Sequence, residues 1–367
     1  MPSVIEVTNL DDLAGFRLLW NALLSQTPGA TFFQSLDWLD SYWRHFGDGQ
    51  KLRVLIVSAG GEPVGILPLI HRTEPTRVGP VCVLTYPLDD WGSFYGPIGP
   101  NPTATLLAGL QHLRAMPRDW DLLDFRWVDP RFDRGRTTSA MQATGFWPGN
   151  QSWACSSVVD LSAGWEDYWK SRTRKWRHNV SRLHRRLAER GRVSYVRHRP
   201  EGRAAGDDDP RWDLYDACVE IARQSWQGAS TTGTTLSHES VFSFLRDSHA
   251  QAAKAGGVDL NLLLVDDRPV AFAYNYVYRG SVFGLRKGFS PDWADVGPGT
   301  VLQYLALEDS SRRGDWLYDL GPGSLEIKEP WQTGTVTSTR HTHYPAAPRA
   351  QVLRLKHWLR KAVASGK

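Results

Sequence analysis

Cysteine is scarce in this sequence, and its three residues lie far apart. Cys82, Cys155 and Cys218 are spread over 367 residues, with no spacing that suits a zinc site or a disulfide framework. We therefore expect no metal site, and we interpret the three thiols as buried groups of a protein in the reducing cytoplasm.

Long hydrophobic runs are also missing. No apolar run approaches the roughly 18 residues that suggest a membrane-spanning helix. Residues 1–13 carry acidic side chains and neither the basic nor the apolar region of a signal peptide. These absences predict a cytoplasmic protein, for which peripheral contact with a membrane remains an alternative.

Familiar catalytic motifs of several enzyme classes are absent as well. The sequence contains no Gly-x-Ser-x-Gly, no P-loop and no His-Glu-x-x-His, because His238-Glu239 lacks the second histidine. The sequence therefore argues against a serine hydrolase of the elbow type, a P-loop nucleotidase and a zincin protease.

The composition that remains is that of an ordinary globular protein. It is 41% hydrophobic and 22% charged, with a net charge of +4 and 17 tryptophans. The length suggests two domains or one large one. Most of the tryptophans are expected to pack in cores, because their large rings bury much apolar surface.

Two segments of the first half recur in the second half in the same order. The run LRVLIVSAGGEP at 52–63 resembles LNLLLVDDRP at 260–269, and DWDLLD at 119–124 resembles DWLYD at 315–319. A helix-like stretch precedes the second segment each time, which indicates a duplicated α+β unit. We predict one domain over 1–153 and a second over 154–367.

The second half contains a strand, a glycine-rich turn, a helix and another strand between residues 283 and 321. The turn Gly297-Pro298-Gly299-Thr300 stands before the helix and directs backbone N–H groups and the positive end of the helix dipole to one point. Such a point binds phosphate. The first half offers Gly99-Pro100-Asn101-Pro102 instead, where two prolines lack the N–H donor.

Three motifs of the second half resemble a known family. Val296-Gly297-Pro298-Gly299-Thr300, Tyr318-Asp319-Leu320-Gly321 and Ile327-Lys328-x-x-Trp331 are similar to GNAT acyltransferases of the cellulose-biosynthesis-like (BioF2-like) group. That group is related to the Fem-type peptidyltransferases. The resemblance runs from about residue 32 to residue 333. It implies two tandem GNAT folds with mixed central sheets, an acyl thioester or aminoacyl-tRNA as donor, and an amine as acceptor.

The resemblance also implies a role for each domain, with the acceptor held on the side of 1–153 and the donor bound by 154–367. The donor, acyl-CoA with an acetyl or longer chain, would bind at Leu285, Arg286, Lys287, Val296, Gly297, Gly299 and Thr300. Attack of an amine on a thioester needs a general base and a group that stabilises the oxyanion, for which the candidates are Asp319 or Glu326 as base and Lys328 facing the oxyanion or orienting the acceptor. A structural Asp319–Lys328 ion pair is the alternative. The acceptor would bind at Asp90, Trp91, Tyr95 and Trp331.

A basic helix is expected over residues 165–190. Residues 170–190 contain nine lysines and arginines, interleaved with apolar residues at helical spacing. A charge run of this kind is usually a solvated face. The functional alternatives are contact with CoA phosphates, with tRNA or with an anionic membrane surface.

Together these features predict an acyl-CoA-dependent N-acyltransferase acting on an amine of a small molecule, lipid, peptide or sugar. One alternative is a Fem-like transferase that uses aminoacyl-tRNA on a cell-wall precursor. Against it, the sequence lacks the inserted helical hairpin common in Fem-type relatives. The other alternative is a binding protein that kept the fold without turnover, which the glycine turn together with Asp319 and Lys328 disfavours.

Overall fold

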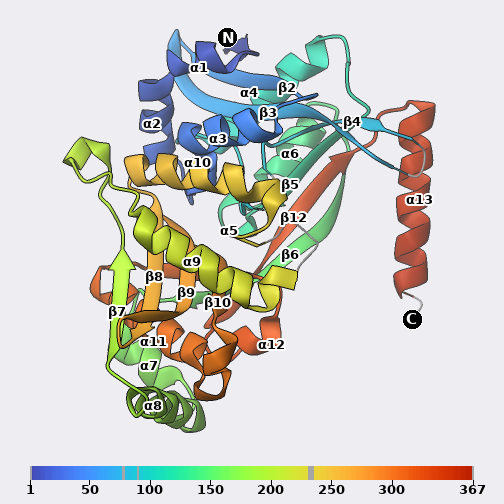
Figure 1. Cartoon of the computed structure of the whole chain (residues 1–367). Coiled ribbons are helices and arrows are strands. Elements are labelled where there is room, and N and C mark those ends of the chain that lie inside the picture. The colour runs from blue at the N-terminus through green and yellow to red at the C-terminus, as the bar shows by residue number, and fades with distance from the viewer. Residues whose placement is uncertain (1, 77–78, 89–90, 230–234, 366–367) are drawn as a thin grey trace. The chain divides into compact units, whose positions relative to one another are not determined.

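The computed structural model describes residues 2–76, 79–88, 91–229 and 235–365 (Figure 1). The chain forms two compact units. The first comprises Met1–Asp89, Ser93–Ala154 and Thr337–Lys367, and the second comprises Asp90–Gly92 and Cys155–Val336. This division differs from the expected one, because residues 337–367 belong with the first unit: they supply a strand that pairs with its sheet.

The first unit is built on a mixed sheet whose strand order is β1-β2-β3-β4-β5-β12. Its strands are β1 Ser3–Val7, β2 Lys51–Ala59, β3 Glu62–Glu74, β4 Val81–Thr85, β5 Leu122–Val128 and β12 Gly334–His343. Its helices are α1 Leu10–Ala14, α2 Arg17–Ser25, α3 Leu36–Phe46, α4 Pro102–Ala115, α5 Pro130–Asp133, α6 Arg136–Ala143 and α13 Pro348–Ser365. Only β4 and β5 run parallel, as expected for two strands joined through a helix.

The second unit has the strand order β6-β11-β10-β9-β8-β7. Its strands are β6 Pro148–Asp160, β7 Val193–His198, β8 Val258–Val265, β9 Arg268–Tyr278, β10 Ser281–Phe289 and β11 Leu317–Pro322. Its helices are α7 Trp165–Ser171, α8 Arg174–Ala188, α9 Trp212–Gln224, α10 Glu239–Ala255, α11 Pro298–Arg312 and α12 Leu325–Lys328. Strands β6 and β12 each carry residues of both units.

Helices cover both faces of the second sheet, because successive side chains of a strand point to opposite faces. Ala273 of β9 shares a core cluster with Val301 of α11. The next residue, Tyr274, lies against Tyr215 of α9 and His249 of α10. Helix α11 and the pair α9/α10 therefore enclose the sheet from opposite sides.

The expected helix over 165–190 is two helices. Thr173 lies between α7 and α8, and its hydroxyl accepts a hydrogen bond from the Trp176 backbone N–H. The side chain thereby caps a new helix, which is why the chain turns there instead of continuing. The repeated sequence segments fall on equivalent elements, the hairpins β2–β3 and β8–β9 and the strands β5 and β11.

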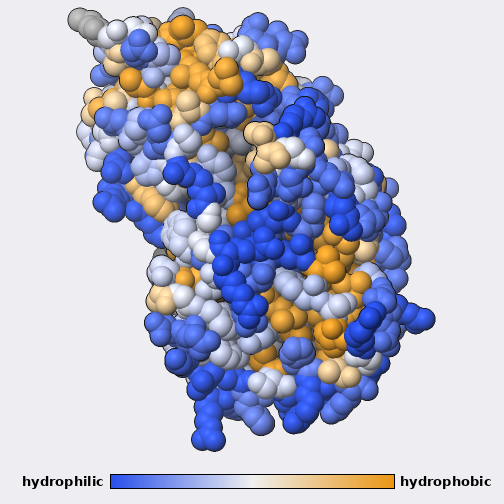
Figure 2. Space-filling view, turned by 90° about the vertical axis from the view of Figure 1, so that its left-hand side faces the viewer, coloured by the Kyte–Doolittle hydropathy of each residue, from blue (hydrophilic) through white to orange (hydrophobic). Residues whose placement is uncertain are grey.

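Figure 2 shows one face, on which hydrophilic side chains (blue) predominate and apolar ones (orange) gather in separate patches. No helix in the described ranges is both long and apolar enough to cross a membrane.

Candidate active site

Strands β10 and β11 run parallel and then part. Their register covers Ser281–Leu317, Val282–Tyr318 and Phe283–Asp319, and in the described chain it ends there. At the same point β10 shifts its pairing with β9 between Gly284 and Arg286, so that Leu285 forms a β-bulge. A bulge bends a strand and increases its local twist. The bulge therefore lies immediately after the last paired position of β10 and β11.

Two glycines let the strands touch just before they part. A Cβ atom on Gly284 would lie 2.8 Å from the Asp319 carbonyl oxygen. One on Gly321 would lie 2.9 Å from the Gly284 carbonyl oxygen. Side chains would not fit at either position. Sequence reasoning does not single out Gly284, although a glycine inside a strand is the ordinary sign of a close backbone approach.

After β10 the chain enters a 3₁₀ turn, Pro291–Val296, and then α11. Gly297 is the N-cap of α11, with φ +61° and no capping side chain. A glycine adopts this left-handed conformation without steric cost. The helix therefore begins with N–H groups that no side chain of the cap position occupies, beside the end of β10.

Apolar side chains pack closely around the two glycines of the turn. A Cβ on Gly297 would lie 3.0 Å from Leu183 Cδ1 of α8, and one on Gly299 would lie 3.3 Å from Phe289 Cδ1 of β10. Val296 beside them is buried in the same core cluster as Leu183. The turn is therefore clamped between α8 and β10, while Gly297, Gly299 and Thr300 stay half-exposed.

The end of β11 holds a buried carboxylate and a buried ammonium. Asp319 is 1% exposed, and its Oδ1 accepts a hydrogen bond from Gly321 N–H at 2.7 Å. Lys328, 6% exposed, donates from Nζ to the Gly321 carbonyl at 2.7 Å and to the Pro322 carbonyl at 2.8 Å. An ammonium has three N–H groups, so a third remains after these two bonds.

The ammonium of Lys328 is easier to deprotonate than an ordinary lysine. Burial, together with the nearby charges of Lys287 and Arg286, lowers the pKa of Lys328 to about 8, and the charge of Asp319 opposes this shift. Because the group is buried among two other cations, it is suited to receive negative charge.

Arg286 brings together two predicted sites. Its guanidinium lies 4.2 Å from the centre of the Trp91 ring, a cation–π distance. Arg286 belongs to the predicted donor site and Trp91, which is 2% exposed, to the predicted acceptor site. Both lie in the second unit, although Trp91 comes from the first quarter of the sequence.

Comparison with known proteins identifies this arrangement. Residues 174–332 match the profile of a family described as acetyltransferase (GNAT) domain. They form a GNAT domain. No curated protein sequence matches the chain.

Solved structures resemble nearly the whole chain at low identity. FemX has a TM-score of 0.65 at 13% identity, covering 95% of this chain and 99% of its own. The C-terminal domain of a protein described as a lysylphosphatidylglycerol synthetase from Agrobacterium fabrum has a TM-score of 0.58 at 14% identity, covering 93% and 95%. A protein of unknown function from Bacteroides thetaiotaomicron VPI-5482 has a TM-score of 0.54 at 12% identity, covering 94% and 100%. At these identities the likeness concerns the fold. The prediction of a GNAT-type α+β acyltransferase is confirmed.

The GNAT domain brings some predicted site residues together and separates others. Leu285, Arg286 and Lys287 follow the bulge of β10, and Asp319 and Lys328 lie at the end of β11. Glu326 is exposed on the short helix α12.

The predicted acceptor residues have different surroundings. Trp331 is 3% exposed, packs beside Trp169 and Trp176, and accepts the Tyr168 hydroxyl hydrogen bond at its carbonyl. Tyr95 belongs to the first unit, where it lines a small cavity of about 50 Å³ with Gln34. Asp90 lies outside the described residues.

Helix α8 lies beside the turn of the GNAT domain through Leu183. Its arginines are paired only loosely: Arg185 lies 3.9 Å from Glu189, and Arg186 lies 3.7 Å from Asp295. Among the described side chains, no cluster of three or more His, Cys, Asp or Glu could hold a metal ion.

Proposed function

We propose that the protein is an acyl-CoA-dependent N-acyltransferase whose donor binds between the ends of β10 and β11. The observation that carries this proposal is the glycine N-cap of α11, which has no capping side chain and follows, after one 3₁₀ turn, the strand whose parallel register with β11 ends at Phe283–Asp319. The N–H groups at that terminus suit the pyrophosphate, and the backbone of Leu285, Arg286 and Lys287 beyond the bulge suits the pantetheine.

The chemistry assigned to the site is amine attack on a thioester. The amine nitrogen forms a bond to the carbonyl carbon, the C–S bond breaks, and the thiolate leaves with the electron pair. Asp319, a buried carboxylate at the strand end, takes the proton from the amine. The remaining N–H of Lys328 faces the oxygen on which negative charge develops.

Acceptor residues are proposed on the same basis. Trp91 is placed against Arg286, so an acceptor that contacts Trp91 would lie near the donor end of β10. Acetyl-CoA or a longer acyl-CoA from the cytoplasm is the proposed donor, and a small-molecule, lipid, peptide or sugar amine is the proposed acceptor. Contact with the membrane periphery would follow if the acceptor is a lipid.

The direct test is thiol release from acyl-CoAs of different chain length with a panel of candidate amines. Calorimetric binding of CoA, followed by thiol release that requires an amine, is the expected result. Binding of CoA without release for any acyl chain and amine tested would favour the binding-protein alternative. Absence of both would contradict the donor assignment.

A second candidate is transfer from aminoacyl-tRNA, as in Fem-type proteins. The exposed arginines of α8, beside the α11 turn, favour it because they could contact nucleic-acid phosphates. Transfer of a radiolabelled aminoacyl group from charged tRNA, in the absence of CoA, distinguishes this candidate from the first.

A further inference from the structure

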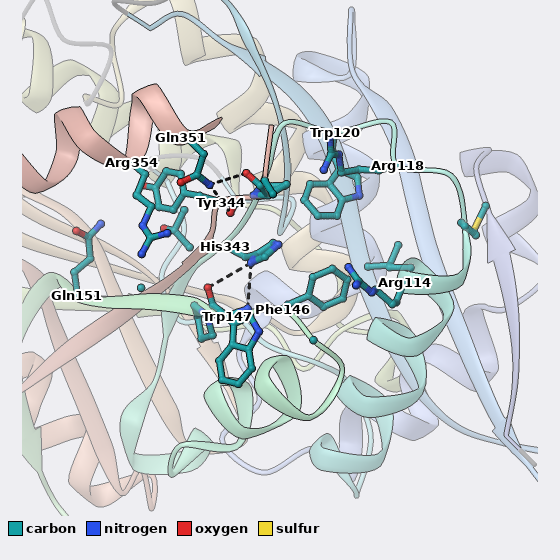
Figure 3. A pocket seen from close by; sticks show the side chains of 18 residues that line it. Arg114, Arg118, Trp120, Phe146, Trp147, Gln151, His343, Tyr344, Gln351 and Arg354 are labelled. Atoms are coloured by element: carbon teal, nitrogen blue, oxygen red, sulfur yellow. Dashed lines mark hydrogen bonds between the residues drawn. The ribbon is translucent and has the colours of Figure 1, made fainter. Parts of the chain in front are cut away.

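The first unit contains a cavity of about 1010 Å³ that no predicted site residue lines (Figure 3). Arg114 comes from the end of α4, and Phe146 and Trp147 immediately precede β6. His343 ends β12, and Arg354 lies on α13. Segments from three distant parts of the chain therefore build this cavity, which explains why the sequence gives no sign of it.

The cavity is strongly positive. Its lining includes Arg114, Arg118 and Arg354 and not one aspartate or glutamate. Within the described ranges none of these three guanidiniums has a carboxylate partner. Figure 3 shows Arg114 and Arg118 on one side and Arg354 on the other, with His343 between them. Guanidinium groups in such a setting keep the fork of N–H donors that matches phosphate oxygens.

Two of these arginines lie near aromatic rings that form part of the cavity wall. The Arg114 guanidinium lies 5.9 Å from the centre of the Phe146 ring, and that of Arg118 lies 5.9 Å from the Trp120 ring. Both rings are buried. Trp147, by contrast, is 69% exposed. A large indole left in water next to a cavity is an unsatisfied stacking surface.

His343 contacts the backbone of Trp147. Its Nδ1 accepts a hydrogen bond from the Trp147 backbone N–H at 3.1 Å and lies 3.3 Å from the Trp147 carbonyl oxygen. Burial lowers the pKa of His343, the backbone hydrogen bond with Trp147 opposes this shift, and the charges of Arg114 and Arg118 add to it. The neutral imidazole thus serves as an acceptor at neutral pH, and the positive charge of the cavity comes from the three arginines.

We propose that this cavity binds a soluble phosphate ester with a flat aromatic group, the chemical class of nucleotides. The phosphates would lie among Arg114, Arg118 and Arg354, and the aromatic group would stack on Trp147. The volume is at the upper end of the range for small-molecule sites, so a ligand of nucleotide size fits. The site lies wholly in the first unit and does not depend on the proposed donor site.

The test is calorimetric titration of ADP into the full-length protein with CoA at saturation, so that any donor site is filled. We compare the wild type with a variant carrying Arg114→Gln, Arg118→Gln and Arg354→Gln. The matched control carries Arg17→Gln, Arg44→Gln and Arg134→Gln, which remove the same charge from first-unit positions outside the lining. The cavity variant is expected to bind ADP at least ~10-fold more weakly, since hydrogen bonds to charged groups contribute about 1.5–3 kcal/mol. The control should bind like the wild type.

Location and ligand class have separate readouts. Hydrogen exchange should show ADP protecting residues 114–120, 146–151 and 342–354. Trp147→Ala should weaken ADP about 10-fold, because stacking of a base contributes roughly 1–3 kcal/mol, and should leave inorganic pyrophosphate binding unchanged. No ADP binding by the wild type, equal binding by the cavity variant or protection only elsewhere would each overturn the proposal. If phosphatidylcholine–phosphatidylglycerol vesicles bind through the three arginines and ADP does not, the ligand is a lipid head group and the nucleotide assignment is wrong.

Discussion

Each unit contains one pair of parallel strands with a register of the same length, and the surroundings of the two pairs differ. In the first unit β4 and β5 pair from Val83–Leu122 to Thr85–Asp124. In the second, β10 and β11 pair from Ser281–Leu317 to Phe283–Asp319. Each register covers three positions and ends at an aspartate.

The helix that follows the first strand differs between the units. Helix α4 begins at Asn101, whose side-chain oxygen accepts a hydrogen bond from the Ala104 N–H at 3.1 Å. Helix α11 begins at Gly297, which has no side chain to do the same. The first helix has a capping side chain at its N-terminus, whereas the second has none, and there the Thr300 N–H donates to the Gly297 carbonyl oxygen at 3.0 Å.

The aspartates at the ends of the two registers, Asp124 and Asp319, also differ in their partners. Asp124 is ion-paired with Arg126 at 2.6 Å and with Arg340 at 2.7 Å, and it accepts the Thr342 hydroxyl. Burial would raise the pKa of the Asp124 carboxyl, but the two arginines hold it below its usual range. Asp319 accepts a hydrogen bond from the Gly321 backbone N–H at its Oδ1. The carboxylate in the first unit is therefore ion-paired with two arginines, whereas that in the second accepts a backbone N–H.

Among the variants that test this comparison, Lys328→Met is expected to change kcat most. If the ammonium faces the oxyanion, kcat should fall about 100- to 1000-fold while CoA affinity changes little. Lys328 also holds the Gly321 and Pro322 carbonyls, so some stability should be lost with it. The measurement is kcat together with the melting temperature, and Lys328→Arg should rescue kcat poorly because a planar fork replaces a compact ammonium. Retained turnover in a less stable protein would leave Lys328 with a structural role only.

The aspartates provide a paired test. Asp319→Asn keeps an oxygen for the Gly321 N–H and removes the charge, so kcat should fall about 100-fold with little change in stability. Asp124→Asn should lower the free energy of unfolding by about 3 kcal/mol, because Arg126 and Arg340 lose their shared carboxylate. Denaturant titration and steady-state kinetics on both variants check the contrast. If Asp319→Asn loses stability instead of turnover, the two copies serve the same structural purpose.

The pH profile should differ between lysine and arginine at position 328. The pKa of Lys328 is about 8, so its ammonium is present below that pH and is lost as the pH rises through it. The alkaline limb of kcat should therefore appear near pH 8 in the wild type. It should vanish in Lys328→Arg, whose guanidinium stays charged. An identical alkaline limb in both proteins would assign it to another group.

The helix N-termini can be tested in parallel. Gly299→Val must displace Phe289, which lies where the new side chain would go, and should weaken CoA binding about 10-fold. Asn101→Ala removes the cap of α4 and should cost about 1 kcal/mol of stability without changing CoA affinity. Calorimetry with CoA and denaturant titration separate the two effects. Unchanged CoA binding in Gly299→Val would contradict donor binding at this turn.

The smallest effect is expected from α8. Reversing the charges of Arg182, Arg185 and Arg186 should raise the donor or acceptor KM about fivefold at low salt and leave kcat unchanged. The difference should shrink as salt shortens the Debye length, ~10 Å at 0.1 M. Kinetics over a series of salt concentrations measure it, and wild-type behaviour throughout would make α8 an ordinary solvated face.

Much of the second unit could be predicted because its candidate site residues belong to short sequence motifs. The turn at Gly297–Gly299, the strand ending in Asp319 and the following Lys328 are local patterns, and a family resemblance aligns them. The fold of the hairpins likewise follows from short hydrophobic runs around turn residues.

What could not be predicted depends on contacts between distant segments. Nothing in the sequence places Trp91 against Arg286, or Arg354 in one cavity with Arg114. Threonine is a common helix cap, so the sequence could have indicated the start of a new helix at Thr173. The apolar spacing continues on both sides of Thr173, however, and this spacing favours a single helix. Propensity and spacing describe neighbours along the chain, whereas these features arise from packing.

The return of residues 337–367 to the first unit has a consequence for synthesis on the ribosome. Apart from Asp90–Gly92, the second unit consists of Cys155–Val336, which is translated between Ser93–Ala154 and Thr337–Lys367 of the first. At about 5–20 residues per second, the emerging β5 waits roughly ten to forty seconds for β12, its partner strand. During that interval the edge of β5 is an open strand, which invites pairing with other chains. The inserted acyltransferase domain can therefore complete its fold first. Until β12 emerges, the nascent chain needs protection at the open edge of β5 in the first unit.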